Sequence, residues 1–204
     1  MTDHPRSLIL VLGPQGSGKG TQIALLREQC GLPAVSAGEL LRQTDPRTDL
    51  GRHVHALIDQ GKLVTLDLWQ AVVGDYLDHA DLSQGYLLDG VVRTMEQEAL
   101  FSPMLTDRQL PPASVLSITL DDGAAIERLL KRAAIEGRAD DTAAGIRQRL
   151  SLMRSVTQPV IDHYRSIGRC VEVNGHQTIE AVHADIVAGL TAAHLLPQGS
   201  DGHC

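Results

Sequence analysis

The chain has 204 residues, a formal net charge of −7 and only 2% aromatic residues. This length suits one domain with its own hydrophobic core, whereas the acidic balance and the scarcity of aromatic rings argue against nucleic-acid partners. No apolar run approaches the ~20 residues that span a bilayer, and the opening MTDHPRS lacks the apolar stretch of a secretory signal. We therefore expect a cytoplasmic protein with neither nucleic-acid nor membrane partners.

Short apolar runs alternate with segments of helical spacing along the chain. The runs predict buried parallel strands at 7–12, 85–89 and 115–120, with a less apolar one at 169–173. A parallel sheet covered by helices on both faces follows, with ligands at the carboxyl ends of its strands. The helical spacing covers 19–30, 37–43, 50–60, 66–79, 94–106, 122–136, 141–167 and 177–194.

The first strand runs directly into the glycine-rich stretch GPQGSGKGT, residues 13–21. Glycine at 13, 16 and 18 allows positive φ angles, so that backbone N–H groups can point toward one anion. The N-terminus of the following helix and Lys19 add positive charge, so the pattern predicts a phosphate-binding loop. The alternative is a glycine turn beside an incidental lysine. The residue after the lysine is Gly20, and the hydroxyl that such loops offer to Mg²⁺ comes one position later, at Thr21.

Further polar residues lie where the same sheet edge is expected. Asp89 ends an apolar run and can hold Mg²⁺ through water, although Asp-Gly is also an ordinary turn sequence. Arg128 and Arg132 are four positions apart, so on a helix they point to one side. Taken singly, each of these arginines would be an ordinary solvated helix residue.

Five blocks between about residue 7 and residue 190 resemble nucleoside monophosphate kinases, most closely the adenylate kinase family. The glycine between the loop lysine and the threonine is also typical of that family. The blocks are GPQGSGKGTQ (13–22), SAGELLR (36–42), GKLVT (61–65), GYLLDGVVRTMEQ (85–97), and ERLLKR, GRADD and IRQRL within 127–150.

The resemblance implies an α/β, three-layer P-loop fold with a parallel central sheet, a helical NMP-binding flap and a short lid. The implied reaction moves the γ-phosphoryl of MgATP to a nucleoside monophosphate, with ATP as phosphoryl donor and Mg²⁺ as cofactor. No nucleophilic side chain is needed, because the task is positioning and charge stabilisation. The implied partners are small-molecule nucleotides, and since the family is often monomeric we expect a monomer.

The resemblance also assigns roles to individual residues of this sequence. The catalytic residues would be Lys19, Arg93, Arg132, Arg138 and Arg149. ATP would contact Gly13, Gly16, Ser17, Gly18, Lys19, Gly20, Thr21, Arg128 and Gln177. The monophosphate would contact Ser36, Ala37, Arg42, Leu63, Val64, Gly90, Arg93 and Gln97. Thr21 and Asp89 would contact Mg²⁺, mainly through bridging water molecules.

The expected layout is a single P-loop kinase domain over 1–194, with a disordered tail at 195–204. Its core comprises 1–30, 66–132 and 143–194. The monophosphate-binding lobe covers about 31–65. The short lid, about 133–142, lacks the long insertion and the zinc cysteines that some members of the family carry.

Two features bear on which monophosphate is used. Gln97 stands where adenylate kinases read the adenine edge, which favours AMP. Ala37 replaces the threonine typical of adenylate kinases, and its block reads like that of UMP/CMP kinases, yet those usually carry asparagine where this chain has Thr94. AMP is the favoured acceptor, and a UMP/CMP-type kinase is the alternative.

A departure from the family lies just before Arg93. Val91-Val92 replaces the family's Phe-Pro, whose proline usually follows a cis bond, and a cis bond without proline costs ~3 kcal/mol. We therefore expect a different local backbone, and with it a different angle for Arg93. A catalytically weakened nucleotide-binding relative would tolerate this change, whereas a nucleotide-binding switch would have no use for so many arginines at acceptor and lid positions.

Overall fold

A parallel five-stranded sheet forms the centre of the computed structural model, which describes residues 7–60, 62, 64–136 and 143–196. The strand order is β2-β3-β1-β4-β5, so the strand that precedes the glycine-rich loop lies in the middle. The strands are β1 (Leu8–Leu12), β2 (Ala34–Ser36), β3 (Tyr86–Asp89), β4 (Ser114–Thr119) and β5 (Cys170–Asn174). This arrangement confirms the predicted α/β class with a parallel sheet.

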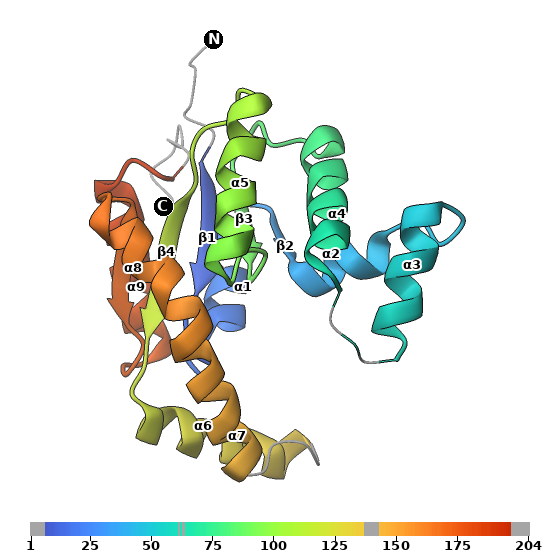
Figure 1. Cartoon of the computed structure of the whole chain (residues 1–204). Coiled ribbons are helices and arrows are strands. Elements are labelled where there is room, and N and C mark those ends of the chain that lie inside the picture. The colour runs from blue at the N-terminus through green and yellow to red at the C-terminus, as the bar shows by residue number, and fades with distance from the viewer. Residues whose placement is uncertain (1–6, 61, 63, 137–142, 197–204) are drawn as a thin grey trace.

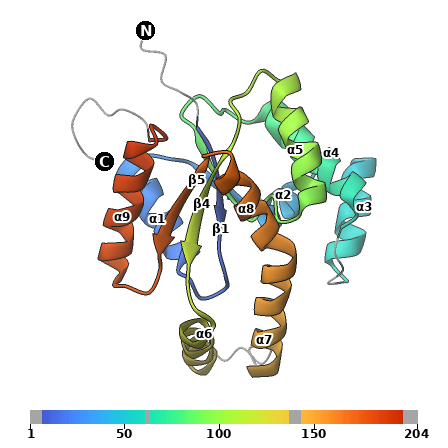
Figure 2. The ribbon, with the colours of Figure 1, turned by 60° about the vertical axis from the view of Figure 1, so that its left-hand side comes forward.

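Helices connect the strands and cover both faces of the sheet (Figures 1 and 2). The first half of the chain contributes α1 (Lys19–Cys30), α2 (Ala37–Gln43), α3 (Asp49–Ile58), α4 (Leu66–His79) and α5 (Met95–Asp107). The second half contributes α6 (Asp122–Glu136), α7 (Ala143–Leu152), the π-helical turn η1 (Met153–Thr157), α8 (Gln158–Ser166) and α9 (Ile179–Ala192). None of the helices in the described ranges combines the length and apolar character required to cross a bilayer.

The alternating side chains of β1 divide the core into two layers. Leu8, Leu10 and Leu12 face a cluster built with α4, α5 and α8. Ile9 and Val11 face the opposite cluster, built with α1 and α9. Since all five side chains are almost completely buried, β1 reads as one continuous apolar run, as strands covered on both faces do.

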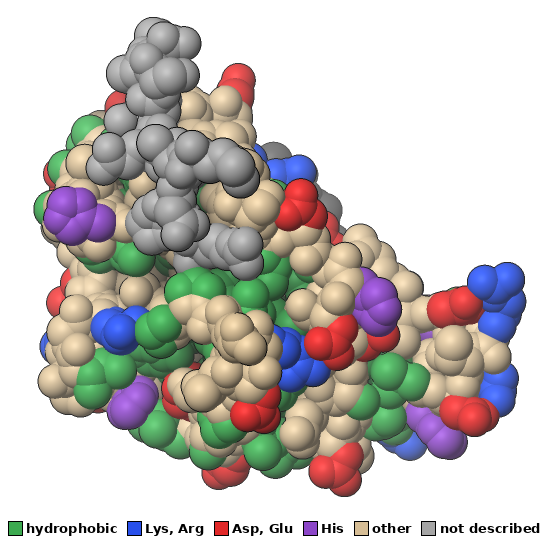
Figure 3. All heavy atoms as spheres, turned by 90° about the horizontal axis from the view of Figure 1, so that it is seen from above, with side chains coloured by type: hydrophobic (Ala, Val, Ile, Leu, Met, Phe, Trp, Pro, Cys, Tyr) green, Lys and Arg blue, Asp and Glu red, His purple; other side chains and the backbone are tan. Residues whose placement is uncertain are grey.

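Two helical arms extend from the sheet (Figure 1). One consists of α2 and α3. The other consists of α6 and α7, which pack on each other through a small apolar cluster that includes Leu129 and Ile146. Around α3, acidic and basic side chains lie side by side (Figure 3), and ion pairs join Arg47 to Asp45 and Arg52 to Asp49. The exposed face of this arm therefore carries charged side chains of both signs, as solvated surfaces do.

The predicted elements are confirmed with three differences. First, β2 was not predicted, because a three-residue strand between Pro33 and the helix cap at Ser36 shows no period. Second, the helix expected at 141–167 contains a π turn in its described part: Pro159 has no N–H to donate, and the Gln158 N–H bonds to Met153 O. Third, Leu195 and Leu196, expected in a disordered tail, pack against the α1 and α9 face.

Candidate active site

The glycine-rich loop adopts the predicted backbone. Gly13, Gly16 and Gly18 have φ angles of 144°, 84° and 92°, which confirms that these glycines supply positive φ. A Cβ at Gly13 would lie 2.3 Å from the carbonyl oxygen of Ile118, so the loop packs directly on the backbone of β4. A side chain at Gly13 or Gly18 would therefore be disfavoured by the positive φ angle, and at Gly13 it would also clash with β4.

Lys19 points back into the loop that precedes it. Its Nζ donates to the carbonyl oxygens of Gly13 (2.8 Å) and Pro14 (2.9 Å). The pKa of the Lys19 ammonium is lowered to about 8, mainly by burial; the negative charge of Asp89 opposes this shift and the positive charge of Arg93 adds to it. Asp89 and Arg93 are thus close enough for their charges to act on Lys19, although both lie far from it in the sequence.

The start of α1 opens toward solvent. A Cβ at Gly18 or Gly20 would meet nothing within 4 Å, and Thr21 is exposed on the first turn of the helix. Ser17 is only 2% exposed, and within the described residues its hydroxyl makes no hydrogen bond. The space above Gly18, next to the helix N-terminus, is where an anion can approach the backbone N–H groups.

The α6 arm lies against the same loop. A Cβ at Gly16 would come within 3.2 Å of the Ala125 carbonyl oxygen and 3.3 Å of Leu129, both on α6. Arg128, also on α6, donates from Nη1 to Gly16 O at 3.3 Å. The predicted grouping of Arg128 with the glycine loop is therefore present.

The other arginines predicted at the phosphoryl group lie on the same arm. Arg132 on α6 and Arg149 on α7 are half-buried, and the Nε atom of each is buried. Because α6 and α7 pack on each other, their guanidinium groups belong to one arm. Arg138, like residues 137–142 of the expected lid, lies outside the described residues.

The loop from Gly90 to Arg93 follows β3 at the same sheet edge. Gly90 has a φ of 61°, and a Cβ there would lie 2.5 Å from Nη2 of Arg93. The Arg93 guanidinium lies over Gly90, with Nε donating to Gly90 O at 2.9 Å. No peptide bond in the described ranges is cis, in agreement with the backbone expected for Val91-Val92.

Gln97 caps the helix that follows this loop. Its Oε1 accepts from the N–H of Arg93 at 2.7 Å and from the N–H of Thr94 at 3.3 Å, while the Gln97 N–H donates to the Thr94 hydroxyl at 3.1 Å. These reciprocal bonds form a capping box, so the amide expected to read a base also fixes the backbone at Arg93.

The remaining acceptor-side residues lie on or near α2. The Ser36 hydroxyl accepts from the N–H of Glu39 at 3.1 Å and caps the helix, and the Ser36 N–H lowers the pKa of the Glu39 carboxyl. Ala37 is half-buried, Arg42 is exposed in the last turn, and Val64 packs against the main core. Leu63 lies outside the described residues.

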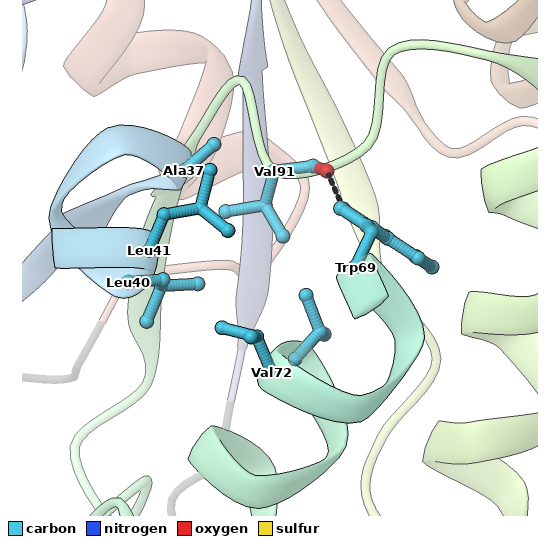
Figure 4. A pocket seen from close by; sticks show the side chains of 7 residues that line it. Ala37, Leu40, Leu41, Trp69, Val72 and Val91 are labelled. Carbon is cyan, nitrogen blue, oxygen red and sulfur yellow. Dashed lines mark hydrogen bonds between the residues drawn. The ribbon is translucent and has the colours of Figure 1, made fainter. Parts of the chain in front are cut away.

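A small apolar pocket separates α2 from α4 (Figure 4). Its volume of about 10 Å³ corresponds to roughly one water molecule, so the pocket as it stands does not accommodate a base. Its lining residues are Ala37, Leu40, Leu41, Trp69, Val72, Val73 and Val91.

Gln177, the last predicted ATP contact, is exposed in the loop after β5. Its Nε2 donates to Asn174 O at 2.9 Å and to Asp185 Oδ2 at 2.7 Å. The neighbouring Gly175 approaches the phosphate loop, since a Cβ there would lie 3.1 Å from Ser17 O. The loop after β5 therefore adjoins the site, whereas the hydrogen bonds of the Gln177 side chain join it to Asn174 and Asp185.

The family model of adenylate kinase matches residues 11–169. The chain belongs to the adenylate kinase family. Among its relatives, the adenylate kinase of Synechococcus sp. (strain CC9311) is 41% identical over 175 residues, which are 85% of this chain and 93% of the relative. The adenylate kinase of Corynebacterium aurimucosum is 39% identical, with the same two coverages. That of Bifidobacterium longum is 37% identical and covers 89% of this chain and 98% of the relative.

Membership of the adenylate kinase family makes the protein a nucleoside monophosphate kinase, which uses ATP as phosphoryl donor. The site described above agrees with this chemistry. Lys19, Asp89, Arg93 and Arg128 all lie at or near the glycine-rich loop. One residue that lines the small apolar pocket, Trp69, was not singled out in the sequence analysis. Trp69 lies on α4, four residues after GKLVT, and belongs to no motif. The one signal that could have drawn attention to it is that it is the single tryptophan of the chain.

The lowered pKa of Lys19 predicts that nucleotide binding depends on pH. The ammonium is charged below pH 8 and neutral above it in the free protein, and bound phosphates favour the charged form. Binding should therefore take up a proton near pH 8 and above, and ADP affinity should fall by up to about tenfold per pH unit there. Calorimetry in two buffers of different ionisation enthalpy measures the uptake. Equal apparent enthalpies in both buffers at pH 8.5 would contradict it.

Proposed function

We propose that this protein transfers the γ-phosphoryl group of MgATP to AMP and so forms two molecules of ADP. The observation that carries the proposal is that Asp89 and Arg93, at the carboxyl edge of the sheet, both lie close enough to Lys19 for their charges to act on it. The phosphate loop provides a place for the donor, and the loop at 90–93 provides one for the acceptor. An oxygen of the acceptor phosphate attacks the γ-phosphorus, and the bond to the β-phosphate oxygen breaks.

On the donor side, we assign the phosphates to the N–H groups of the loop and of the first turn of α1. Lys19 leaves the carbonyl oxygens of Gly13 and Pro14 and donates to the phosphates instead, which restores its full charge. Arg128 is placed beside the loop at Gly16, and Gln177 is expected near the adenine end. Arg132, Arg138 and Arg149 are assigned to the moving phosphoryl group, where spread negative charge must be stabilised.

The residues at this edge suit Mg²⁺ carried by the nucleotide. Thr21 and Asp89 offer a hydroxyl and a carboxylate, which are the hard oxygen donors that this ion prefers. Within the described ranges, no group of three or more acidic, histidine or cysteine side chains could hold a metal. The protein would therefore orient the ion with these two groups and water, while the phosphates supply its other ligands. When bound, Mg²⁺ neutralises charge on the triphosphate.

On the acceptor side, we assign the monophosphate to Arg42 and Arg93, and the nucleoside to the lobe formed by Ser36, Ala37, Leu63, Val64 and Gly90. Both lone pairs of Gln97 Oε1 are directed at the N–H groups of Arg93 and Thr94. The NH₂ group of Gln97 is therefore the part expected to meet the base. Adenine offers ring-nitrogen acceptors to such a donor, so AMP fits it, and the choice of AMP over other monophosphates rests on membership of the adenylate kinase family.

A coupled assay of ADP release with AMP, CMP, UMP, GMP and dTMP in turn tests the acceptor. We expect AMP to give the highest kcat/KM. Highest activity with UMP or CMP would establish the UMP/CMP-type alternative. Nucleotide binding without turnover of any acceptor would instead establish a non-catalytic relative and overturn the proposal.

The proposal includes a layout that brings the two nucleotides together and excludes water. The core comprises 1–30, 66–132 and 143–194, and the lobe at about 31–65 and the lid at about 133–142 close over the phosphates. We propose that the protein acts as a cytoplasmic monomer. Small-angle scattering should show a smaller radius of gyration with a dinucleoside polyphosphate than without it, and an unchanged radius would contradict closure.

A further inference from the structure

Trp69 links α4 to the loop that carries Arg93. The indole is only 5% exposed, and its Nε1–H donates to the carbonyl oxygen of Val91 at 2.8 Å (Figure 4). This is a buried hydrogen bond between residues 22 positions apart. It fixes a point of the loop two residues before Arg93.

The rest of the loop is held from other directions. The Val91 side chain points into the apolar pocket between α2 and α4, and Val91 and Val92 are at most 1% exposed (Figure 4). The N–H of Arg93 donates to Gln97 on α5, and the Arg93 guanidinium lies on the Gly90 carbonyl oxygen. The direction of the Arg93 side chain therefore depends on where the carbonyls of Gly90 and Val91 point.

The sequence of this loop lacks an internal restraint. A proline would fix φ near −65°, whereas Val92 has no ring and leaves that angle to its surroundings. Since the backbone before Arg93 is not fixed by its own covalent structure, contacts from outside the loop must fix it. The indole N–H is a donor suited to this task, because it comes from a helix packed into the main core.

We propose that Trp69 is a positioning residue for the acceptor phosphate: its indole N–H holds the Val91 carbonyl and thereby aims the Arg93 guanidinium. The proposal rests on the assignment of Arg93 to the monophosphate. A buried indole also needs a partner for its N–H in any protein, so a purely structural role predicts a loss of stability alone. A positioning role predicts in addition a selective loss on the acceptor side.

The test compares Trp69→Phe with Leu77→Val. Phenylalanine keeps an aromatic ring but removes the N–H, while Leu77 lies further along the same helix in the same core cluster, so its variant loses packing only. Removing a donor to a buried carbonyl should raise the KM and the Kd for AMP by about five- to tenfold in Trp69→Phe. The KM for ATP should change less than about twofold. In Leu77→Val both KM values should stay within about twofold of the wild type.

Steady-state kinetics with each substrate varied, calorimetric binding of AMP and thermal unfolding supply these values. An unchanged AMP constant in a folded Trp69→Phe protein would overturn the proposal, even while wild-type turnover of AMP upholds the proposed function. Equal changes in the AMP and ATP constants, or the same acceptor defect in Leu77→Val, would also overturn it, since either result indicates a general loss of packing. Absence of AMP binding and turnover in the wild type would remove the premise of both proposals.

Discussion

Lys19→Met should lower kcat about 10²- to 10³-fold, a loss typical of removing one charge-stabilising donor, while the protein stays folded. Methionine keeps much of the length of the side chain but carries no charge, so the phosphates would lose the ammonium group that we assign to them. Replacement relieves the cost of burying the ammonium, but it removes the donor to the carbonyl oxygens of Gly13 and Pro14, so the free energy of unfolding should fall by no more than about 1–3 kcal/mol. Coupled measurement of ADP release and thermal unfolding by circular dichroism check both parts.

Lys131→Met is the matched control for this variant. Lys131 is exposed on α6, so the same substitution there removes one positive charge without touching the phosphate loop. Its kcat should stay within about twofold of the wild type, since an exposed charge is screened by solvent. Wild-type turnover in folded Lys19→Met, or an equal loss in Lys131→Met, would contradict the role of Lys19.

The donor side of the site could be predicted because its geometry is local. The glycines at 13, 16 and 18 have the positive φ angles that their spacing implies, and Lys19 follows them within the same turn. An apolar run before a glycine loop also predicts which end of a strand binds the ligand. Two other elements were harder to predict: β2 spans only three residues, and the π turn η1 comes just before Pro159, which has no N–H to donate.

The acceptor side depends on contacts between distant residues, which a single sequence does not reveal. The replacement of Phe-Pro by Val91-Val92 could be seen in the sequence, but the bond from Trp69 to Val91 could not. Gln97 was predicted as a base-reading residue, whereas the bonds by which it caps α5 and holds the Arg93 N–H follow only from the fold.

Gly13→Ala should lower the free energy of unfolding by about 2–5 kcal/mol, through the strain of φ at 144° and the clash of an added Cβ at 2.3 Å from Ile118 O. The obstacle is the backbone of a central strand, so it cannot rotate away as a flexible side chain would. Either the loop or β4 must shift, and both carry the site. Urea denaturation followed by circular dichroism measures the loss.

Gly20→Ala supplies the comparison, because it adds the same methyl group to the same glycine-rich stretch. Nothing lies within 4 Å of a Cβ at Gly20, and the residue sits in the first turn of α1. Its stability should stay level or rise by up to about 1 kcal/mol, as alanine favours a helix over glycine. A difference of less than about 1 kcal/mol between the two variants would show that the loop does not rest on β4 as described, and that the position of Lys19, which donates to Gly13 and Pro14, is not fixed by that contact.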